Sequence, residues 1–211
     1  MSYNIGAVAV RTDTKSINLA DIICNVISTK YRELNRDELY TSSNYKENFD
    51  FRFDDCFTVF KTEFYIIIAN SHTASKFFSA DSDLIADKFY SYFNESKQIF
   101  AFEYYQSSDT YGYSIIENGK LVRQFKASQL STTEFGPPLN IECKWLDLPE
   151  IDFEEDGENY RGFKHPDYNI IYHKESLYSF LFQEVFKHEI DFHIDDLDYK
   201  TIEVKFFRLT K

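Results

Sequence analysis

The dipeptide Asn118-Gly119 is the feature that most limits how this chain can fold. It separates two strand-like runs, residues 111–117 and 120–126. A two-residue type I′ turn needs positive φ at both central positions, and Asn followed by Gly adopts that geometry readily. The sequence therefore predicts an antiparallel hairpin in which Glu117 lies opposite Lys120.

The register of this hairpin places an arginine in an apolar row. Its next facing pairs are Ile115 with Val122 and Ser114 with Arg123. Alternation then puts Leu121, Arg123 and Phe125 on one face. An unpaired guanidinium inside a protein costs several kcal/mol. Glu142, beyond the bend at residues 136–138, is the expected ion-pair partner, and the pair would hold the irregular segment against the sheet. The alternative is an open face on which Arg123 is solvated.

Periodicity along the rest of the chain predicts about three helices and several strands. Apolar residues recur at helical spacing in residues 18–34, 81–94 and 175–188. Strand-like runs occupy residues 5–10, 57–60, 64–69, 98–105, 111–117, 120–126 and 201–207, with a weaker one at 168–172. This order is neither regular βαβ alternation nor all-β. We expect an α+β fold, a single mixed, mainly antiparallel sheet with about three helices packed on it.

The sequence changes in character near residue 130. All four prolines lie within residues 137–166, and residues 131–211 hold twice as many acidic as basic side chains. We expect residues 1–130 to form the α+β sheet core. Residues 131–211 are expected to form a coil-rich acidic segment with one apolar helix and a C-terminal strand, which completes the same domain.

The net charge of −12 limits the partners that the protein can bind. Nucleic acids and anionic membranes are bound mainly through Lys and Arg, so an acidic surface repels both. We therefore expect neither a nucleic acid nor a membrane as partner, and a basic protein is the better candidate. The sequence also has no signal-peptide pattern and no apolar run long enough to span a bilayer, which predicts a cytoplasmic protein.

Residues 147–158 concentrate the acidity, with seven carboxylates in twelve positions. One interpretation is a solvated acidic loop; the other is a docking surface for the basic partner, with Ile151 among the apolar anchors. The residues expected to contact the partner are Trp145, Glu150, Asp152, Phe153, Glu154, Glu155, Asp156 and Glu158. The spacing partly resembles a calcium loop, but Phe163 occupies the position that requires a bidentate glutamate.

Other chemical signatures are absent from the sequence. His188 and His193 are one residue too far apart for a helical zinc pair, although an extended segment would place His193 beside Asp191 and Asp195. There is no Gly-x-Ser-x-Gly motif and no glycine-rich phosphate loop, and the three cysteines are too isolated to suggest a metal site. We expect no metal, no cofactor and no catalytic residue.

A resemblance covers about residues 100–190. The segment Asn118-Gly119-Lys120-Leu121-Val122-Arg123 is followed by Phe135-Gly136-Pro137-Pro138-Leu139-Asn140-Ile141-Glu142, then by His165-Pro166. In this order it resembles a bacterial domain family of unknown function, in which a Gly-x-Leu-x-Arg hairpin precedes a Gly-x-Pro-Leu-x-x-Glu segment, a His-Pro step and a helix. The resemblance implies a fold region and no activity.

Three functional hypotheses follow. The first is a non-enzymatic acidic binding protein, of the immunity type that neutralises a cationic protein such as a toxin domain. The second is an enzyme or small-ligand-binding domain with a dispersed polar site at Arg123, Glu142, His165 and His173. The third is a homo-oligomer that forms through the apolar helix, using Leu177, Phe180, Leu181, Phe182, Val185 and Phe186.

Overall fold

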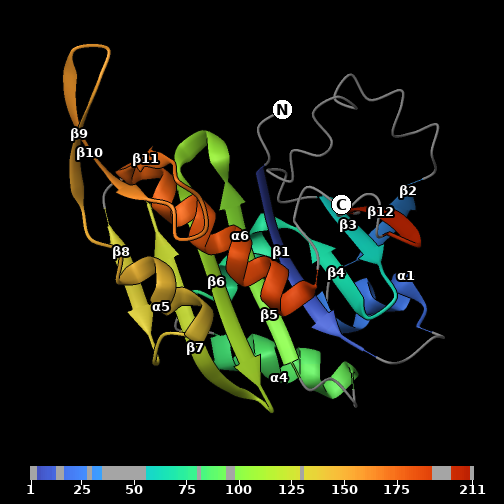
Figure 1. Ribbon diagram of the computed structural model, residues 1–211. Helices are drawn as coiled ribbons and strands as arrows, with labels where there is room; N and C mark the ends of the chain where they lie inside the picture. The colour runs from blue at the N-terminus through green and yellow to red at the C-terminus, as the bar shows by residue number, and fades with distance from the viewer. Residues whose placement is uncertain are drawn as a thin grey trace.

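The fold is α+β and consists of two antiparallel sheets with helices packed on them (Figure 1). The computed structural model describes residues 4–12, 17–27, 30–34, 56–79, 82–93, 98–128, 131–191 and 201–209. The α-helices in these ranges are α1 (Leu19–Ile22), α3 (Ser71–Lys76), α4 (Ser82–Tyr92), α5 (Asn140–Leu146) and α6 (Leu177–Ile190). A π-helix, η1 (Ile23–Ile27), continues α1, and short 3₁₀ turns are η3 (Gln106–Ser108) and η4 (Lys174–Ser176).

The larger sheet has nine strands in the order β2-β12-β3-β4-β1-β5-β6-β7-β8. Their bounds are β1 (Asn4–Arg11), β2 (Tyr31–Leu34), β3 (Cys56–Lys61), β4 (Tyr65–Ala69), β5 (Gln98–Tyr105), β6 (Thr110–Glu117), β7 (Lys120–Ala127), β8 (Thr132–Phe135) and β12 (Glu203–Leu209). All neighbouring pairs are antiparallel. The expected boundary at residue 130 crosses this sheet, because β8 and β12 belong to it.

The smaller sheet corrects the expectation of a single mixed sheet. It contains β9 (Ile151–Glu155), β10 (Glu158–Lys164) and β11 (Ile171–His173) in the order β11-β10-β9, again antiparallel. Asp156 and Gly157, with φ of 53° and 83°, form the tight turn that pairs β9 with β10 locally. Most described residues after residue 130 therefore lie in helices or strands, whereas the sequence had suggested a coil-rich segment.

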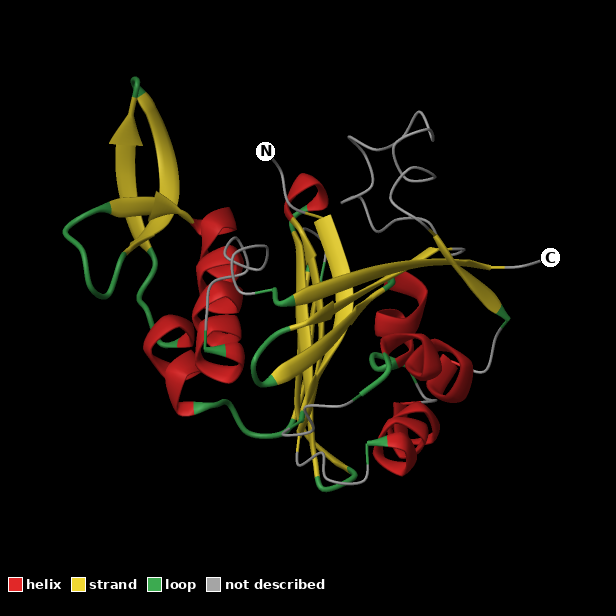
Figure 2. Ribbon diagram, turned by 90° about the vertical axis from the view of Figure 1, so that its right-hand side faces the viewer, coloured by secondary structure: helices red, strands yellow, loops and turns green. Residues whose placement is uncertain are grey.

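Helices cover both faces of the nine-stranded sheet, as Figure 2 shows with that sheet nearly edge-on. On one face, α5 and α6 pack with the smaller sheet in a core rich in Phe and Tyr. On the other face, α1, η1 and α4 enclose a second core of mostly aliphatic residues. The sheet is thus buried on both sides, which explains the nearly continuous apolar runs of β1 and β4.

The first expected helix is much shorter than predicted. Asn18 caps it as expected, since its side chain accepts a hydrogen bond from the Ala20 N–H at 3.1 Å. The last residues of the predicted helix, however, form strand β2, which pairs with β12. The Tyr31 ring lies 4.5 Å from that of Phe57, edge to face. A partner distant in sequence therefore overrides the local helical spacing. The short helices α3 and α5 were missed because they contain too few turns to display a period.

Helix α6 agrees with the predicted position, and four of the six apolar residues expected at an oligomer interface are buried inside the protein itself. Leu181, Phe182, Val185 and Phe186 are at most 1% exposed, since they pack on the nine-stranded sheet. Leu177 and Phe180 are half-buried against the same core. Among the described residues, no helix is both long enough and apolar enough to cross a membrane.

The Asn118-Gly119 hairpin is present, with Glu117 opposite Lys120 as predicted and positive φ at both turn residues. Its further register is different, because a β-bulge makes Val122 an extra residue of β7. Ile115 therefore pairs with Arg123. The bulge turns Leu121 toward the aliphatic core, whereas Arg123 faces α5. The row of Leu121, Arg123 and Phe125 expected on one face does not form.

Candidate partner-binding site

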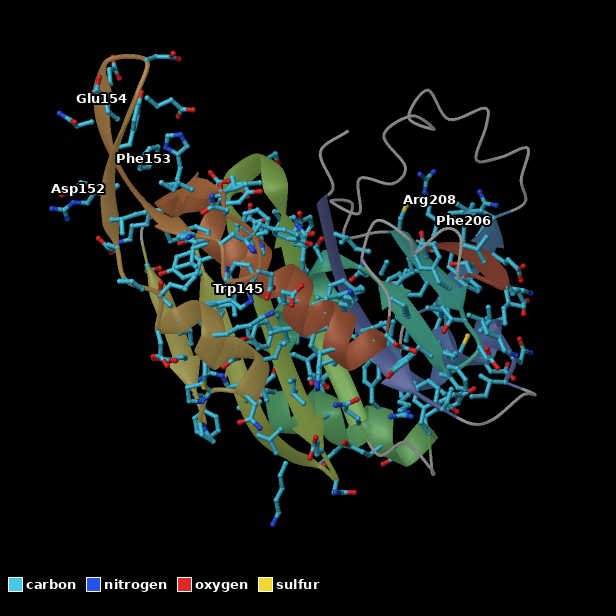
Figure 3. All side chains as sticks on the ribbon, viewed as in Figure 1. Trp145, Asp152, Phe153, Glu154, Phe206 and Arg208 are labelled. Atoms are coloured by element: carbon cyan, nitrogen blue, oxygen red, sulfur yellow. The ribbon has the colours of Figure 1, made fainter. Side chains whose placement is uncertain are left out.

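The expected acidic loop is a β-hairpin formed by β9 and β10, which extends away from the rest of the molecule (Figure 2). Its turn carries the acidic tip, which we define as Glu154, Glu155, Asp156 and Glu158. All four side chains are exposed. Strand alternation places Asp152 and Phe153 on opposite sides of the hairpin (Figure 3). The carboxylates of this segment are therefore carried by a paired hairpin rather than by a loop.

Ion pairs neutralise the base of the hairpin more than its tip. Arg161 Nε lies 3.6 Å from Asp152 Oδ1, and Lys174 Nζ contacts Glu150. The hydrogen bond and charge of Lys174 hold the pKa of Glu150 below its ordinary value. Within the described part of the chain, Glu154 and Asp156 have no such cation. The negative charge available to a partner is therefore concentrated at the acidic tip.

One side of the smaller sheet carries three ring side chains, which we call the aromatic face: Phe153, Tyr160 and His173. Their ring centroids are 4.8–5.8 Å apart, and all three side chains remain partly exposed. Gly162 lies beneath them. A Cβ there would lie 2.7 Å from the Phe153 ring and 2.2 Å from the Tyr172 carbonyl oxygen, so only glycine leaves room for the ring and the neighbouring strand at this position.

Trp145 lies on α5 and is only 1% exposed, so it is not the partner-binding anchor that we expected (Figure 3). Its ring stacks on Phe180 at 5.7 Å and meets Phe163 and His165 edge to face. Trp145 instead joins α5 and α6 to β10, and so fixes the base of the hairpin. Its indole N–H has no hydrogen-bond partner among the described residues. Of the other expected anchors, Ile151 and Phe153 are half-buried on the hairpin.

A buried ion pair holds α5 in place. Arg123 Nε donates to both carboxylate oxygens of Glu142, at 3.1 Å each, and the two residues are 1% and 0% exposed. The Tyr113 hydroxyl also donates to Glu142, and so does the Leu139 N–H at 2.8 Å. The side chains expected to pair therefore do meet. Tyr113 and the Leu139 N–H, which no sequence pattern indicated, supply the other hydrogen bonds to the carboxylate.

The remaining nitrogens of Arg123 bind the edge of the sheet. Nη1 donates to the carbonyl oxygens of Phe135 and Gly136 at 3.3 and 2.8 Å, and Nη2 to Glu134 at 3.0 Å. Gly136 has a φ of 77°, and a Cβ there would lie 2.2 Å from the Val122 carbonyl oxygen. All three nitrogens of the guanidinium donate within the protein and the side chain is 1% exposed, so Arg123 is not available as a ligand contact.

Burial raises the pKa of Glu142 to about 7, while the Leu139 N–H acts in the opposite direction by favouring the carboxylate. Arg123 is the only cationic side chain in contact with Glu142 among the described residues. A positive charge in contact with a carboxyl group favours its ionised form.

The four residues of the dispersed polar site do not converge. His165 lies in the aromatic cluster around Trp145 and accepts a hydrogen bond at Nδ1 from the Asp167 N–H at 3.1 Å. His173 belongs to the aromatic face, where Nε2 lies 2.9 Å from Glu155. Arg123 and Glu142 form the buried pair.

Two other candidates for a small-molecule or metal site remain shallow or incomplete. An open groove of about 530 Å³ lies between η1 and α4, lined by Asn25, Leu84, Asp87, Lys88, Ser91 and Tyr92. The described residues contain no group of three metal-ligating side chains. Asp191 ends α6 with a φ of 64°, whereas His193 and Asp195 lie outside the described residues.

No family model, curated protein or solved structure matches this chain. The roles assigned to its residues therefore rest on its own geometry and charge.

The buried pair predicts strongly coupled effects on stability. Arg123→Met or Glu142→Gln alone should lower the free energy of unfolding by about 3–5 kcal/mol, because each leaves an uncompensated buried polar group. The double variant should lose less than the sum of the two. Arg161→Met is the control, since its ion-paired guanidinium is exposed, and it should cost less than about 1 kcal/mol. Additive losses of under about 1 kcal/mol in denaturant unfolding would contradict the pair.

The pH dependence of Arg123→Met provides a second test. Without the arginine, buried Glu142 keeps a pKa above its ordinary value of 4.5, so the folded variant holds a proton that the unfolded chain releases. Its contribution to stability is complete below pH 4.5 and is lost as the pH rises through the folded-state pKa. Loss of the arginine should raise this pKa further, because an opposite charge favours the carboxylate. The unmodified protein, whose Glu142 has a folded-state pKa of about 7, loses the same contribution up to that pH, so the stability difference should grow only above about pH 7. Glu142→Gln should show no such growth; a pH-independent Arg123→Met difference would refute the assignment.

Proposed function

We propose that this protein is a non-enzymatic binding protein whose β9–β10 hairpin docks on a cationic protein. The observation that carries the proposal is the position of the acidic tip, which projects on an ordered hairpin beyond the body of the molecule (Figure 2). Charges that project into solvent raise the association rate with an oppositely charged protein.

The base of the hairpin supports this proposal, because it is held by the core. Phe163 of β10 packs on Trp145, and the buried Arg123–Glu142 pair fixes the helix that carries Trp145. A surface that is ordered before binding loses less conformational entropy on association. The edge strands of the smaller sheet, β9 and β11, are short, and β9 carries charged side chains. Both features disfavour edge-to-edge pairing with a second copy of the protein.

Within this class, an immunity-type inhibitor of a cationic toxin domain is the specific function that we propose. Such an inhibitor needs fast, charge-steered association and no chemistry of its own. We propose that binding occurs in the cytoplasm, since the three cysteines are thiols and a reducing compartment suits them. The dispersed enzyme or ligand site has less support, because its four residues lie in three environments.

Replacing the hairpin carboxylates should slow association. A variant with serine at Asp152, Glu154, Glu155 and Asp156 should bind the cationic partner, captured from the source organism by the unmodified protein, with a lower association rate. The rate should also depend less on ionic strength, while the melting temperature changes little. Stopped-flow association over a series of salt concentrations measures both effects.

The control removes the same number of charges elsewhere. Serine replaces four exposed carboxylates of the body: Glu63, Asp87, Glu117 and Glu203. This variant should keep most of the association rate, because the removed charges do not project with the hairpin. Equal slowing by both variants, or a captured protein without a basic surface, would refute docking by the hairpin.

A further inference from the structure

Two carboxylates of the acidic tip share a side of the hairpin with the aromatic face. Glu155 and Glu158 are directly opposite each other, two pairs beyond Phe153 and Tyr160 and therefore on the same side of the hairpin. Like charges at facing positions destabilise a strand pair. The nearby basic residue Arg161 does not relieve this repulsion, because it lies on the other side of the hairpin, 3.6 Å from Asp152. The facing carboxylates are therefore placed beside aromatic rings and away from the nearest arginine.

The existing contacts orient these carboxylates without neutralising both. His173 Nε2 lies 2.9 Å from Glu155, and the Tyr160 hydroxyl donates to Glu158 at 2.8 Å. Each carboxylate is thus held at the border of a ring that is still partly exposed. A planar cation placed against Tyr160 would find an aromatic surface below it and acceptors at its edge.

We propose that the aromatic face, together with Glu155 and Glu158, binds one arginine side chain of the cationic partner; this inference rests on the proposed function. The guanidinium lies flat against Tyr160 and directs its N–H groups toward the two carboxylates. Arginine fits better than lysine, because its guanidinium stacks on rings and its several N–H groups diverge in one plane. Charge complementarity selects this occupant, since the site offers two negative charges and, among the described residues, no lysine or arginine that pairs with either of them.

Binding of single amino acid derivatives tests the proposal without a known partner. The probes are N-acetylarginine amide and N-acetyllysine amide, which carry the same charge, titrated at low ionic strength and followed by NMR. The arginine probe should shift the ring resonances of Tyr160 and Phe153, and its δ-methylene protons should move upfield. The lysine probe should bind at least about 3-fold more weakly. No binding of the arginine probe, or equal binding of both, would overturn the proposal.

Variants of the ring separate stacking from hydrogen bonding. Tyr160→Leu should weaken binding of the arginine probe by roughly 3–5-fold, whereas Tyr160→Phe should keep it within about 2-fold. Cross-strand proton contacts between β9 and β10 check that each variant retains the hairpin. Equal loss in both variants would overturn the stacking geometry.

A matched pair of double variants separates the facing carboxylates from charge in general. Glu155→Gln/Glu158→Gln should weaken the arginine probe by about 5-fold, and Glu154→Gln/Asp156→Asn, which removes the same charge from the same turn, by less than about 2-fold. Equal weakening would overturn the arginine site but leave the proposed function standing. A different result would refute the proposed function: the variant with serine at Asp152, Glu154, Glu155 and Asp156 would associate with the captured protein as fast as the unmodified protein does.

Discussion

The buried pair of Arg123 and Glu142 is the interaction on which the rest of the structure depends. It joins three parts of the chain, because Arg123 belongs to β7, Glu142 to α5, and the carbonyl groups of Phe135 and Gly136 to the end of β8. Helix α5 then carries Trp145 to the contact with β10 and α6. Without the pair, the segment after β8 would lose this buried polar attachment to the sheet.

Burying two charges is expensive, and their mutual attraction does not by itself repay the loss of water. The protein offsets this cost by giving both groups several hydrogen bonds. The carboxylate accepts hydrogen bonds from Tyr113, Arg123 and the Leu139 N–H, and the guanidinium donates to two carbonyl oxygens and to Glu134. A network of this kind specifies one position for α5, whereas an apolar contact would tolerate several. For the hairpin, the main effect of this network is to place α5, and with it Trp145, at a defined position.

The hairpin shows the opposite use of charge. Its carboxylates remain in solvent, where their field extends to a distance set by the ionic strength, and they stabilise the fold little. The aromatic rings beside them offer apolar surface that a partner can cover. The two kinds of acidic residue in this protein thus have different roles: Glu142 organises the interior, and the acidic tip is available to a partner.

The sequence by itself determined the features that depend on neighbouring residues. The Asn118-Gly119 turn, the position of α6, the cap at Asn18 and the location of the acidity are all local properties. The pairing of Arg123 with Glu142 was one of two alternatives that the sequence left open, and the burial of both side chains decided between them. Only the tertiary structure decided the features that depend on distant partners. Tyr31 belongs to a strand because β12 pairs with it. The bulge at Val122 turns Leu121 toward the aliphatic core. Trp145 is buried because α6 and β10 both pack on it. Burial and strand pairing are properties of segments brought together by folding, so composition and spacing could not reveal which acidic and aromatic residues remain exposed on the hairpin.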